Sequence, residues 1–176
     1  MTRLLLVRHA RPAAGFDADL DPGLDEVGRE QADALADRLG ARSPLPVISS
    51  PLRRARETAA PLGRRWGCRP VIEEAVGEIP APIGAPTARA AWLRERLDAR
   101  WDEVEDRLLE WRAQLLEVLV ALGEDTVVVT HYVAINTAVG AATGDERLVS
   151  CAPGHASTTE LEVTRGVLAL RSGPAP

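Results

Sequence analysis

Two runs of consecutive apolar residues most constrain how this chain folds. Residues 4–7 (LLLV) and 126–130 (TVVVT) carry apolar or β-branched side chains at every position rather than at alternate positions. A strand of this kind buries both of its faces, which happens in parallel sheets that helices cover on both sides. The two runs therefore favour an α/β fold over an all-helical or all-strand fold.

Strand-like and helix-like patterns alternate along the rest of the chain. Strands are predicted over residues 2–7, 45–50 and 125–131 and at the start of the irregular segment 69–88, and a closing hairpin joins 158–163 to 167–172. Helices are predicted over 25–40, with Asp25 as the N-cap, and over 52–66. Two helical runs precede residue 122, with an apolar stripe that begins at Trp101 and ends at Leu122. We expect a single domain over residues 1–176, a three-layer α/β/α sandwich with a mostly parallel sheet and an antiparallel edge.

Charge and composition exclude several classes of partner. The chain has 176 residues and a net charge of −5, which argues against a broad nucleic-acid or membrane surface. All 21 of its basic Lys and Arg residues are arginine, and its two cysteines form no CxxC pattern. No apolar run is long enough for a membrane span or the core of a signal peptide. We expect a cytoplasmic protein, with any basic site confined to a small region.

Charged residues follow the predicted strands at their carboxyl ends. Arg8 and His9 end the first strand, Arg53 and Arg54 follow the second, and His131 follows the TVVVT strand. Glu73, Glu74 and Glu78 come after the third. Each of these taken alone is compatible with an ordinary exposed strand end, but ligands of parallel sheets gather at this edge. Two histidines beside arginines at one edge predict an anion site, and since no HxH or HExxH pattern is present we expect no metal there.

Four segments resemble the motifs of a known family, the histidine phosphatase superfamily, also called phosphoglycerate mutase-like. These segments are LLLVRHA (residues 4–10), SSPLRRARETA (49–59), EIPAP (78–82) and VVVTH (127–131). Ala10 stands where glycine is usual in the first motif, and Tyr132 follows the second histidine where glycine is common. The resemblance implies the phosphoglycerate mutase-like fold and, within the family, the short phosphatase branch.

The resemblance also implies a role for each matched residue. His9 would be the nucleophile that becomes phosphohistidine, and Arg8, Arg54 and His131 would bind the phosphoryl oxygens. A carboxylic acid would protonate the leaving alcohol, which is too basic to depart as an alkoxide. The substrate would be a small phosphorylated molecule, with no cofactor, because the arginines neutralise the phosphate charge.

Two carboxylates compete for the role of proton donor. Mutase-like members place the acid four residues before a glycine, which selects Glu73 ahead of Gly77. Phosphatase-like members place it farther from the second motif, which selects Glu78. We favour Glu78, because a short branch of the family also carries EIPxP at this place. The partly apolar EIPAP loop can also raise the pKa of its carboxyl by desolvation, as a proton donor needs.

The function favoured is a metal-independent phosphatase that hydrolyses a phosphomonoester. The alternatives are phosphoglycerate mutase-type phosphoryl transfer, a phosphohistidine-protein phosphatase and a non-catalytic phosphate-binding module. Four further residues are candidates for the site: Arg11, which either extends the phosphate pocket or is simply exposed, Thr130, which keeps a hydroxyl before the second histidine, Tyr132, and His155, for which a structural role is favoured over a catalytic one. We expect Tyr132, loop 79–87 and the helical run around Trp92 to decide which alcohol is accepted. The sequence does not specify the oligomeric state.

Overall fold

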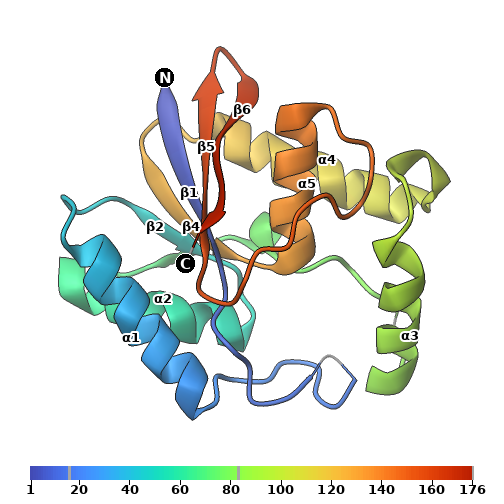
Figure 1. Cartoon of the computed structure of the whole chain (residues 1–176), viewed down its shortest axis with the longest axis horizontal. Coiled ribbons are helices and arrows are strands. Elements are labelled where there is room, and N and C mark those ends of the chain that lie inside the picture. The colour runs from blue at the N-terminus through green and yellow to red at the C-terminus, as the bar shows by residue number, and fades with distance from the viewer. Residues whose placement is uncertain (16, 83, 176) are drawn as a thin grey trace.

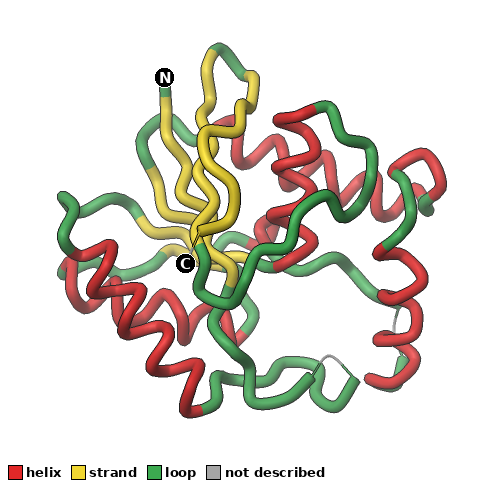
Figure 2. Tube along the Cα trace, in the orientation of Figure 1, coloured by secondary structure: helices red, strands yellow, loops and turns green. Residues whose placement is uncertain are grey.

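The strands form one sheet that is parallel except for two antiparallel strands at one edge. A computed structural model of the chain describes residues 1–15, 17–82 and 84–175. In this part of the chain the sheet has six strands in the order β3-β2-β4-β1-β5-β6 (Figures 1 and 2). Their bounds are β1 (Thr2–Arg8), β2 (Val47–Ser49), β3 (Val71–Ile72), β4 (Thr126–Thr130), β5 (Thr158–Thr164) and β6 (Val167–Ala175). Strands β1 to β4 pair in parallel, and β5 and β6 pair antiparallel, so the predicted sheet is confirmed.

Helices cover both faces of the sheet, which makes the three layers. Helices α1 (Glu26–Gly40) and α2 (Arg53–Trp66) lie on one face, and α4 (Asp106–Ala121) and α5 (Tyr132–Thr143) lie on the other (Figure 1). Helix α3 (Pro86–Leu97) stands apart from the sheet. No helix in the described part of the chain is long and apolar enough to cross a membrane.

The apolar side chains of β1 pack into two separate hydrophobic cores, one on each face of the sheet. Leu4 and Leu6 pack into the cluster under α4 and α5, whereas Leu5 and Val7 pack into the cluster under α1 and α2. Successive side chains of a strand point to opposite faces, so a strand buried on both sides needs an apolar residue at every position. This is the physical reason for the LLLV pattern.

Local signals fix the helix ends as predicted, with one exception. The carboxylate of Asp25 accepts a hydrogen bond from the backbone N–H of Gly28 and caps α1. The apolar stripe that begins at Trp101, however, is not one helix. Trp101 lies in a 3-10 turn before α4, and the extended backbone of Val104 and Glu105 separates the two. The indole of Trp101 is still buried and stacks on Trp111. The helix-like spacing of Trp101 from the later apolar residues therefore reflects shared burial and not one continuous helix.

Candidate active site

A cavity of about 440 Å³ opens at the carboxyl ends of the parallel strands. Residues of the loop between β1 and α1, of α3 and of the start of α5 line its walls. Its described lining residues are Arg8, His9, Pro12, Ala14, Gly15, Asp19, Pro22, Arg54, Glu78, Leu93, Leu97, Tyr132, Val133 and His155. The topology therefore brings the charged residues that follow different strands into one space.

His9 is held with one ring nitrogen facing the cavity. Its Nδ1 donates to the carbonyl of Ala10 at 2.8 Å, because Nε2 is occupied as an acceptor from Nε of Arg54 at 3.3 Å. The N–H of Ala10 is itself bound by the hydroxyl oxygen of Thr58 on α2, at 2.9 Å. Burial, followed by the charge of Arg54, holds the pKa of His9 well below its usual value. The ring is thus neutral, with a lone pair on Nε2.

Arg54 is buried and Arg8 is half-buried, and both line the cavity. Arg54, in the first turn of α2, is only 4% exposed, and its Nη2 lies 3.9 Å from Oε2 of Glu78. Arg8 donates to the carbonyl of Pro153 at 2.8 Å, and its guanidinium stacks 5.0 Å above the Tyr132 ring. Burial lowers the pKa of both groups from their usual value, although arginine stays charged at any physiological pH. Two desolvated guanidiniums that face one cavity favour an anion between them.

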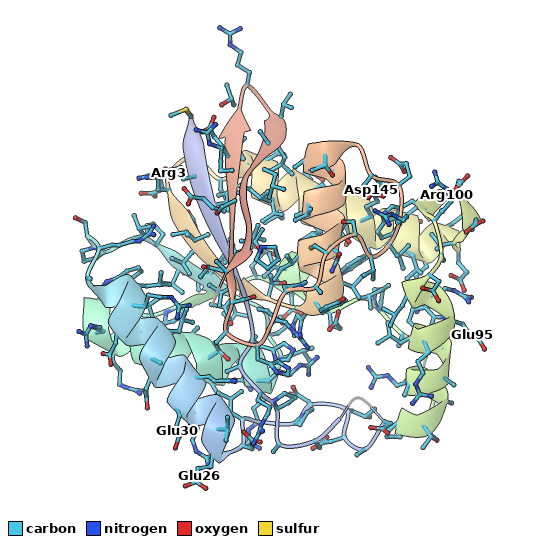
Figure 3. The ribbon with its side chains drawn as sticks, viewed as in Figure 1. Arg3, Glu26, Glu30, Glu95, Arg100 and Asp145 are labelled. Atoms are coloured by element: carbon cyan, nitrogen blue, oxygen red, sulfur yellow. The ribbon has the colours of Figure 1, made fainter. Side chains whose placement is uncertain are left out.

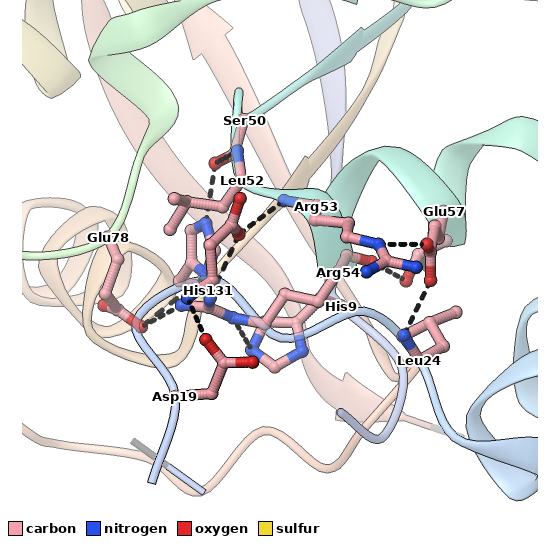
Figure 4. A network of polar contacts seen from close by, with 12 residues as sticks. His9, Asp19, Leu24, Ser50, Leu52, Arg53, Arg54, Glu57, Glu78 and His131 are labelled. Atoms are coloured by element: carbon pink, nitrogen blue, oxygen red, sulfur yellow. Dashed lines mark hydrogen bonds and ion pairs between the residues drawn. The ribbon is translucent and has the colours of Figure 1, made fainter. Parts of the chain in front are cut away.

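His131, which precedes α5, is completely buried and offers one ring nitrogen to the site. Its Nε2 lies 2.7 Å from the hydroxyl of Ser50, which already accepts a hydrogen bond from the N–H of Leu52 (Figure 4). A Ser50 hydroxyl that donates its proton to Nε2 would place the proton of the neutral ring on Nδ1. That Nδ1 has no hydrogen-bond partner among the described residues and lies 3.6 Å from Oε2 of Glu78. Burial, and then the charge of His9, lowers the pKa of His131 well below its usual value.

Glu78 reaches the cavity from the loop after β3. A 3-10 turn over Glu74–Val76 leads into it, and the hydroxyl of Thr130 donates to the carbonyl of Val76 at 2.6 Å. Burial raises the pKa of Glu78, while the charge of Arg54 opposes the rise. The carboxyl therefore holds a proton at a higher pH than an exposed glutamate does. The positive charge of Arg54 reduces this effect but does not reverse it.

The competing acid does not reach the cavity. The carboxylate of Glu73 accepts a hydrogen bond from the N–H of Ala75 at 3.0 Å and caps the 3-10 turn. Arg11 is also turned away, because its guanidinium pairs with Asp25 at 2.6 Å. The side chain of Thr130 lies beneath the site and braces the Glu78 loop. Of the residues that the sequence singles out, the structure thus brings together Arg8, His9, Arg54, Glu78, His131, Tyr132 and His155.

His155 also lines the cavity, beside His9. Its ring centroid lies 5.7 Å from that of His9, which is close to the 5.2 Å between the rings of His9 and His131. Burial and the charge of Arg8 lower the pKa of His155 to about 4, so it is neutral near pH 7. Whether His155 acts structurally or catalytically stays a prediction.

The structure adds residues that the sequence did not single out. Ser50 lies within the matched motif but carries no signal of its contact with His131. The cavity wall formed by the β1–α1 loop, including Asp19, has no sequence signature. Among the described residues of loop 79–87 none lines the cavity, and Ile83 of that loop lies outside the described residues. Trp92 packs against the core, whereas its neighbours Leu93 and Leu97 line the cavity.

The donor set does not resemble a metal centre. Among the described residues, no group of three or more His, Cys, Asp or Glu side chains is arranged to hold a metal ion. Two arginines within the cluster would also repel a divalent cation.

Comparison with known proteins identifies relatives of the whole fold. Residues 4–172 match the histidine phosphatase superfamily (branch 1). A glucosyl-3-phosphoglycerate phosphatase of Mycolicibacterium vanbaalenii is 38% identical over 114 residues, which cover 56% of this chain and 49% of that protein. A metal-independent phosphoserine phosphatase of Arabidopsis thaliana is 32% identical over 155 residues, which cover 74% of this chain and 64% of that protein.

A solved structure is similar over its full length. The mycobacterial glucosyl-3-phosphoglycerate phosphatase in complex with VO3 superposes with a TM-score of 0.78 and 28% identity, over 100% of both chains. In sequence, the chain spans about half the length of the glucosyl-3-phosphoglycerate phosphatases that it matches. The similarity covers the fold and the segments that build the cavity.

Proposed function

The chain belongs to branch 1 of the histidine phosphatase superfamily, and we propose that it is a metal-independent phosphatase that hydrolyses a phosphomonoester through a phosphohistidine on His9. The observation that carries this proposal is the orientation of His9. Its Nδ1 proton is committed to the Ala10 carbonyl, and its Nε2 lone pair accepts from Nε of Arg54 in a cavity that Arg8, Arg54 and His155 also line. A mere anion binder has no need of a neutral, oriented nucleophile.

The cations of the site suit the phosphoryl group of a phosphate ester. Arg8 and Arg54 would bind its oxygens, since the planar guanidinium fork matches two oxygens at once. A proton on Nδ1 of His131 would donate a third hydrogen bond, since no described residue accepts one from it. Together these groups neutralise the charge that otherwise repels a nucleophile, which is the task of the metal in many other phosphatases.

Glu78 would supply and then recover one proton. In the first step Nε2 of His9 bonds to phosphorus, the bond from phosphorus to the leaving oxygen breaks, and the Glu78 carboxyl protonates that oxygen to release the alcohol. In the second step the Glu78 carboxylate removes a proton from water, whose oxygen attacks phosphorus. The bond to Nε2 then breaks and inorganic phosphate leaves. The raised pKa of Glu78 supports the first half of this cycle.

The two alternative enzymatic functions would use the same phosphohistidine, but each differs from a phosphomonoesterase in one step. A mutase would return the phosphoryl group to a second hydroxyl of the substrate, and isomerisation of a phosphoglycerate with a bisphosphate primer tests that. A phosphohistidine-protein phosphatase needs little help from an acid, because the leaving nitrogen departs readily. The position of Glu78 in the cavity, with its raised pKa, favours ester hydrolysis over that alternative.

Hydrolysis of generic phosphomonoesters without metal tests the proposal. The protein, freed of metal with a chelator, should release phosphate from p-nitrophenyl phosphate and from alkyl phosphates, and vanadate should inhibit it. His9→Ala should abolish release, provided its thermal unfolding shows a folded protein. Activity that depends on added divalent metal, or that survives His9→Ala, would overturn the proposal.

A further inference from the structure

The cavity has a charged floor and an apolar upper part. The floor consists of His9, Arg8, Arg54 and Glu78, where the phosphoryl group would lie. Above it, apolar side chains come from three separate elements: Pro12, Ala14 and Pro22 of the β1–α1 loop, Leu93 and Leu97 of α3, and Tyr132 and Val133 of α5. The leaving group of a bound ester has to occupy this upper part.

Helix α3 presents two apolar side chains, Leu93 and Leu97, to the cavity. Leu93 and Leu97 are four residues apart and therefore lie on one face of the helix. Glu95, between them in sequence, points away from the body of the molecule (Figure 3), and its side chain is 70% exposed. The apolar lining is thus a consequence of how α3 is oriented.

The charges available to a leaving group are unfavourable for a second anion. Among the described lining residues, the cationic side chains are Arg8 and Arg54, and both are needed for the phosphoryl group. His155 is neutral near pH 7, because burial holds its pKa at about 4. The remaining charged wall residue is Asp19, which Figure 4 shows beside the phosphate-binding cluster.

From this distribution we propose that the enzyme prefers phosphate esters of uncharged, apolar alcohols over esters whose alcohol carries a carboxylate. The inference rests on the proposed phosphatase function. A carboxylate in the upper cavity would lose its water against leucine side chains and would meet the charge of Asp19 rather than a cation. An alkyl or aryl group would instead bury apolar area against Leu93, Leu97 and Tyr132. This separates the chain from relatives whose names specify phosphoglycerate or phosphoserine substrates.

Arg89 is the nearby cation that could bind a carboxylate of the substrate and so oppose this preference. It lies on α3 and makes an interaction of its own, and its charge acts on both Glu78 and Arg54. It is not among the lining residues of the cavity. If Arg89 were to bind a substrate carboxylate, the preference would be reversed.

A pair of substrates that differ in one group measures the preference. An alkyl phosphate is compared with the same alkyl phosphate ending in a carboxylate, because the two share chain length and leaving-group chemistry. We expect kcat/KM to be at least about tenfold higher for the uncharged ester, which corresponds to about 1.4 kcal/mol of binding in the transition state. Leu97→Arg, which places a cation in the upper cavity, should reduce this ratio, whereas Leu109→Arg, an equal charge on the exposed side of α4, should leave it unchanged.

Each outcome is decisive. Equal or higher kcat/KM for the carboxylated ester overturns the inference while the phosphatase function stands, and loss of that activity in Arg89→Met would then identify the cation responsible. A ratio that Leu97→Arg and Leu109→Arg alter equally also overturns it. Failure to hydrolyse either ester overturns the proposed function itself.

Discussion

Nε of Arg54 lies 3.3 Å from Nε2 of His9 and donates to it, although the two residues are 45 positions apart in sequence. One guanidinium thereby keeps the nucleophilic nitrogen unprotonated, while its Nη1 and Nη2 lie 4.0 Å from Oδ1 of Asp21 and 3.9 Å from Oε2 of Glu78. A bound phosphoryl group would lie between the two side chains, and its oxygens would replace Nε2 of His9 as the acceptor for the guanidinium. The contact therefore links nucleophile activation to substrate binding.

Replacing Arg54 with lysine tests the need for this fork. Arg54→Lys keeps the positive charge but loses the planar set of donors that reaches both His9 and the phosphoryl group. We expect kcat/KM to fall by about 100-fold or more, the scale on which a charge-stabilising donor contributes to catalysis. Steady-state kinetics with an alkyl phosphate measures this. Arg53→Lys is the matched control, because Arg53 is exposed and pairs with Glu57 at 2.7 Å, and a similar fall there would refute a special role for Arg54.

Glu78→Gln should affect substrates according to their leaving group. An alkyl alcohol needs a proton as it leaves, so its ester should lose about 10²- to 10⁴-fold in kcat, the usual contribution of general acid catalysis. A p-nitrophenyl ester leaves as a stable phenolate and should lose much less in the first step. A single-turnover comparison of the two esters separates this step from hydrolysis of the phosphohistidine. Equal losses for both esters would contradict proton donation by Glu78.

The pH dependence of kcat/KM should decline toward alkaline pH. Glu78 donates only while protonated, and burial raises its pKa above the usual value for glutamate. Activity should therefore be retained above the usual pKa of glutamate and lost as the pH rises through the raised pKa. His9 attacks only while neutral, and its lowered pKa moves the acidic loss below the usual histidine range. The substrate phosphate titrates near pH 6 as well. The pH profile of Glu78→Gln with the same ester separates the contribution of Glu78 from those of His9 and the substrate. An unchanged alkaline decline of kcat/KM in that variant would exclude Glu78 as its source.

Ser50 should matter through the ring of His131 rather than through contact with substrate. Ser50→Ala removes the group that faces Nε2 at 2.7 Å and leaves a buried ring nitrogen without its partner, a change worth about 1–3 kcal/mol. We expect kcat/KM to fall about tenfold or more and nitrogen NMR of the His131 ring to show a mixture of tautomers. Ser49→Ala is the matched control, since Ser49 is equally buried but its hydroxyl donates to the Ser50 carbonyl. An unaltered His131 tautomer in Ser50→Ala would refute the positioning role.

The fold and the charged floor of the cavity were accessible from the sequence because each depends on local pattern. Apolar residues at every position of β1 and β4 predicted a covered parallel sheet, and residues at the ends of parallel strands necessarily meet at one edge. The proximity of Arg8, His9, Arg54 and His131 follows from that rule alone.

The choice of proton donor, the position of Arg11 and the apolar walls of the cavity could not be predicted, because they depend on contacts that no local sequence pattern encodes. Glu73 and Glu78 are five residues apart in one loop, and only the 3-10 turn between them decides that Glu78 reaches the cavity. Arg11 was equally compatible with the pocket or with solvent until its pairing with Asp25 was seen. The upper wall is built by a loop and a helix that meet across 70 or more residues of sequence, so Asp19 and Leu97 could not be placed together from spacing.

Trapping the phosphorylated enzyme tests the central claim most directly. The protein is mixed with an ester labelled in its phosphoryl group, quenched without acid because phosphohistidine is acid-labile, and digested for peptide mapping. The proposed mechanism predicts label on Nε2 of His9, and no label in His9→Ala. With p-nitrophenyl phosphate, whose first step needs little help from the acid, the label should accumulate in Glu78→Gln as the second step slows. Turnover of the ester with no label on His9, or label on another residue in the folded wild-type protein, would contradict it.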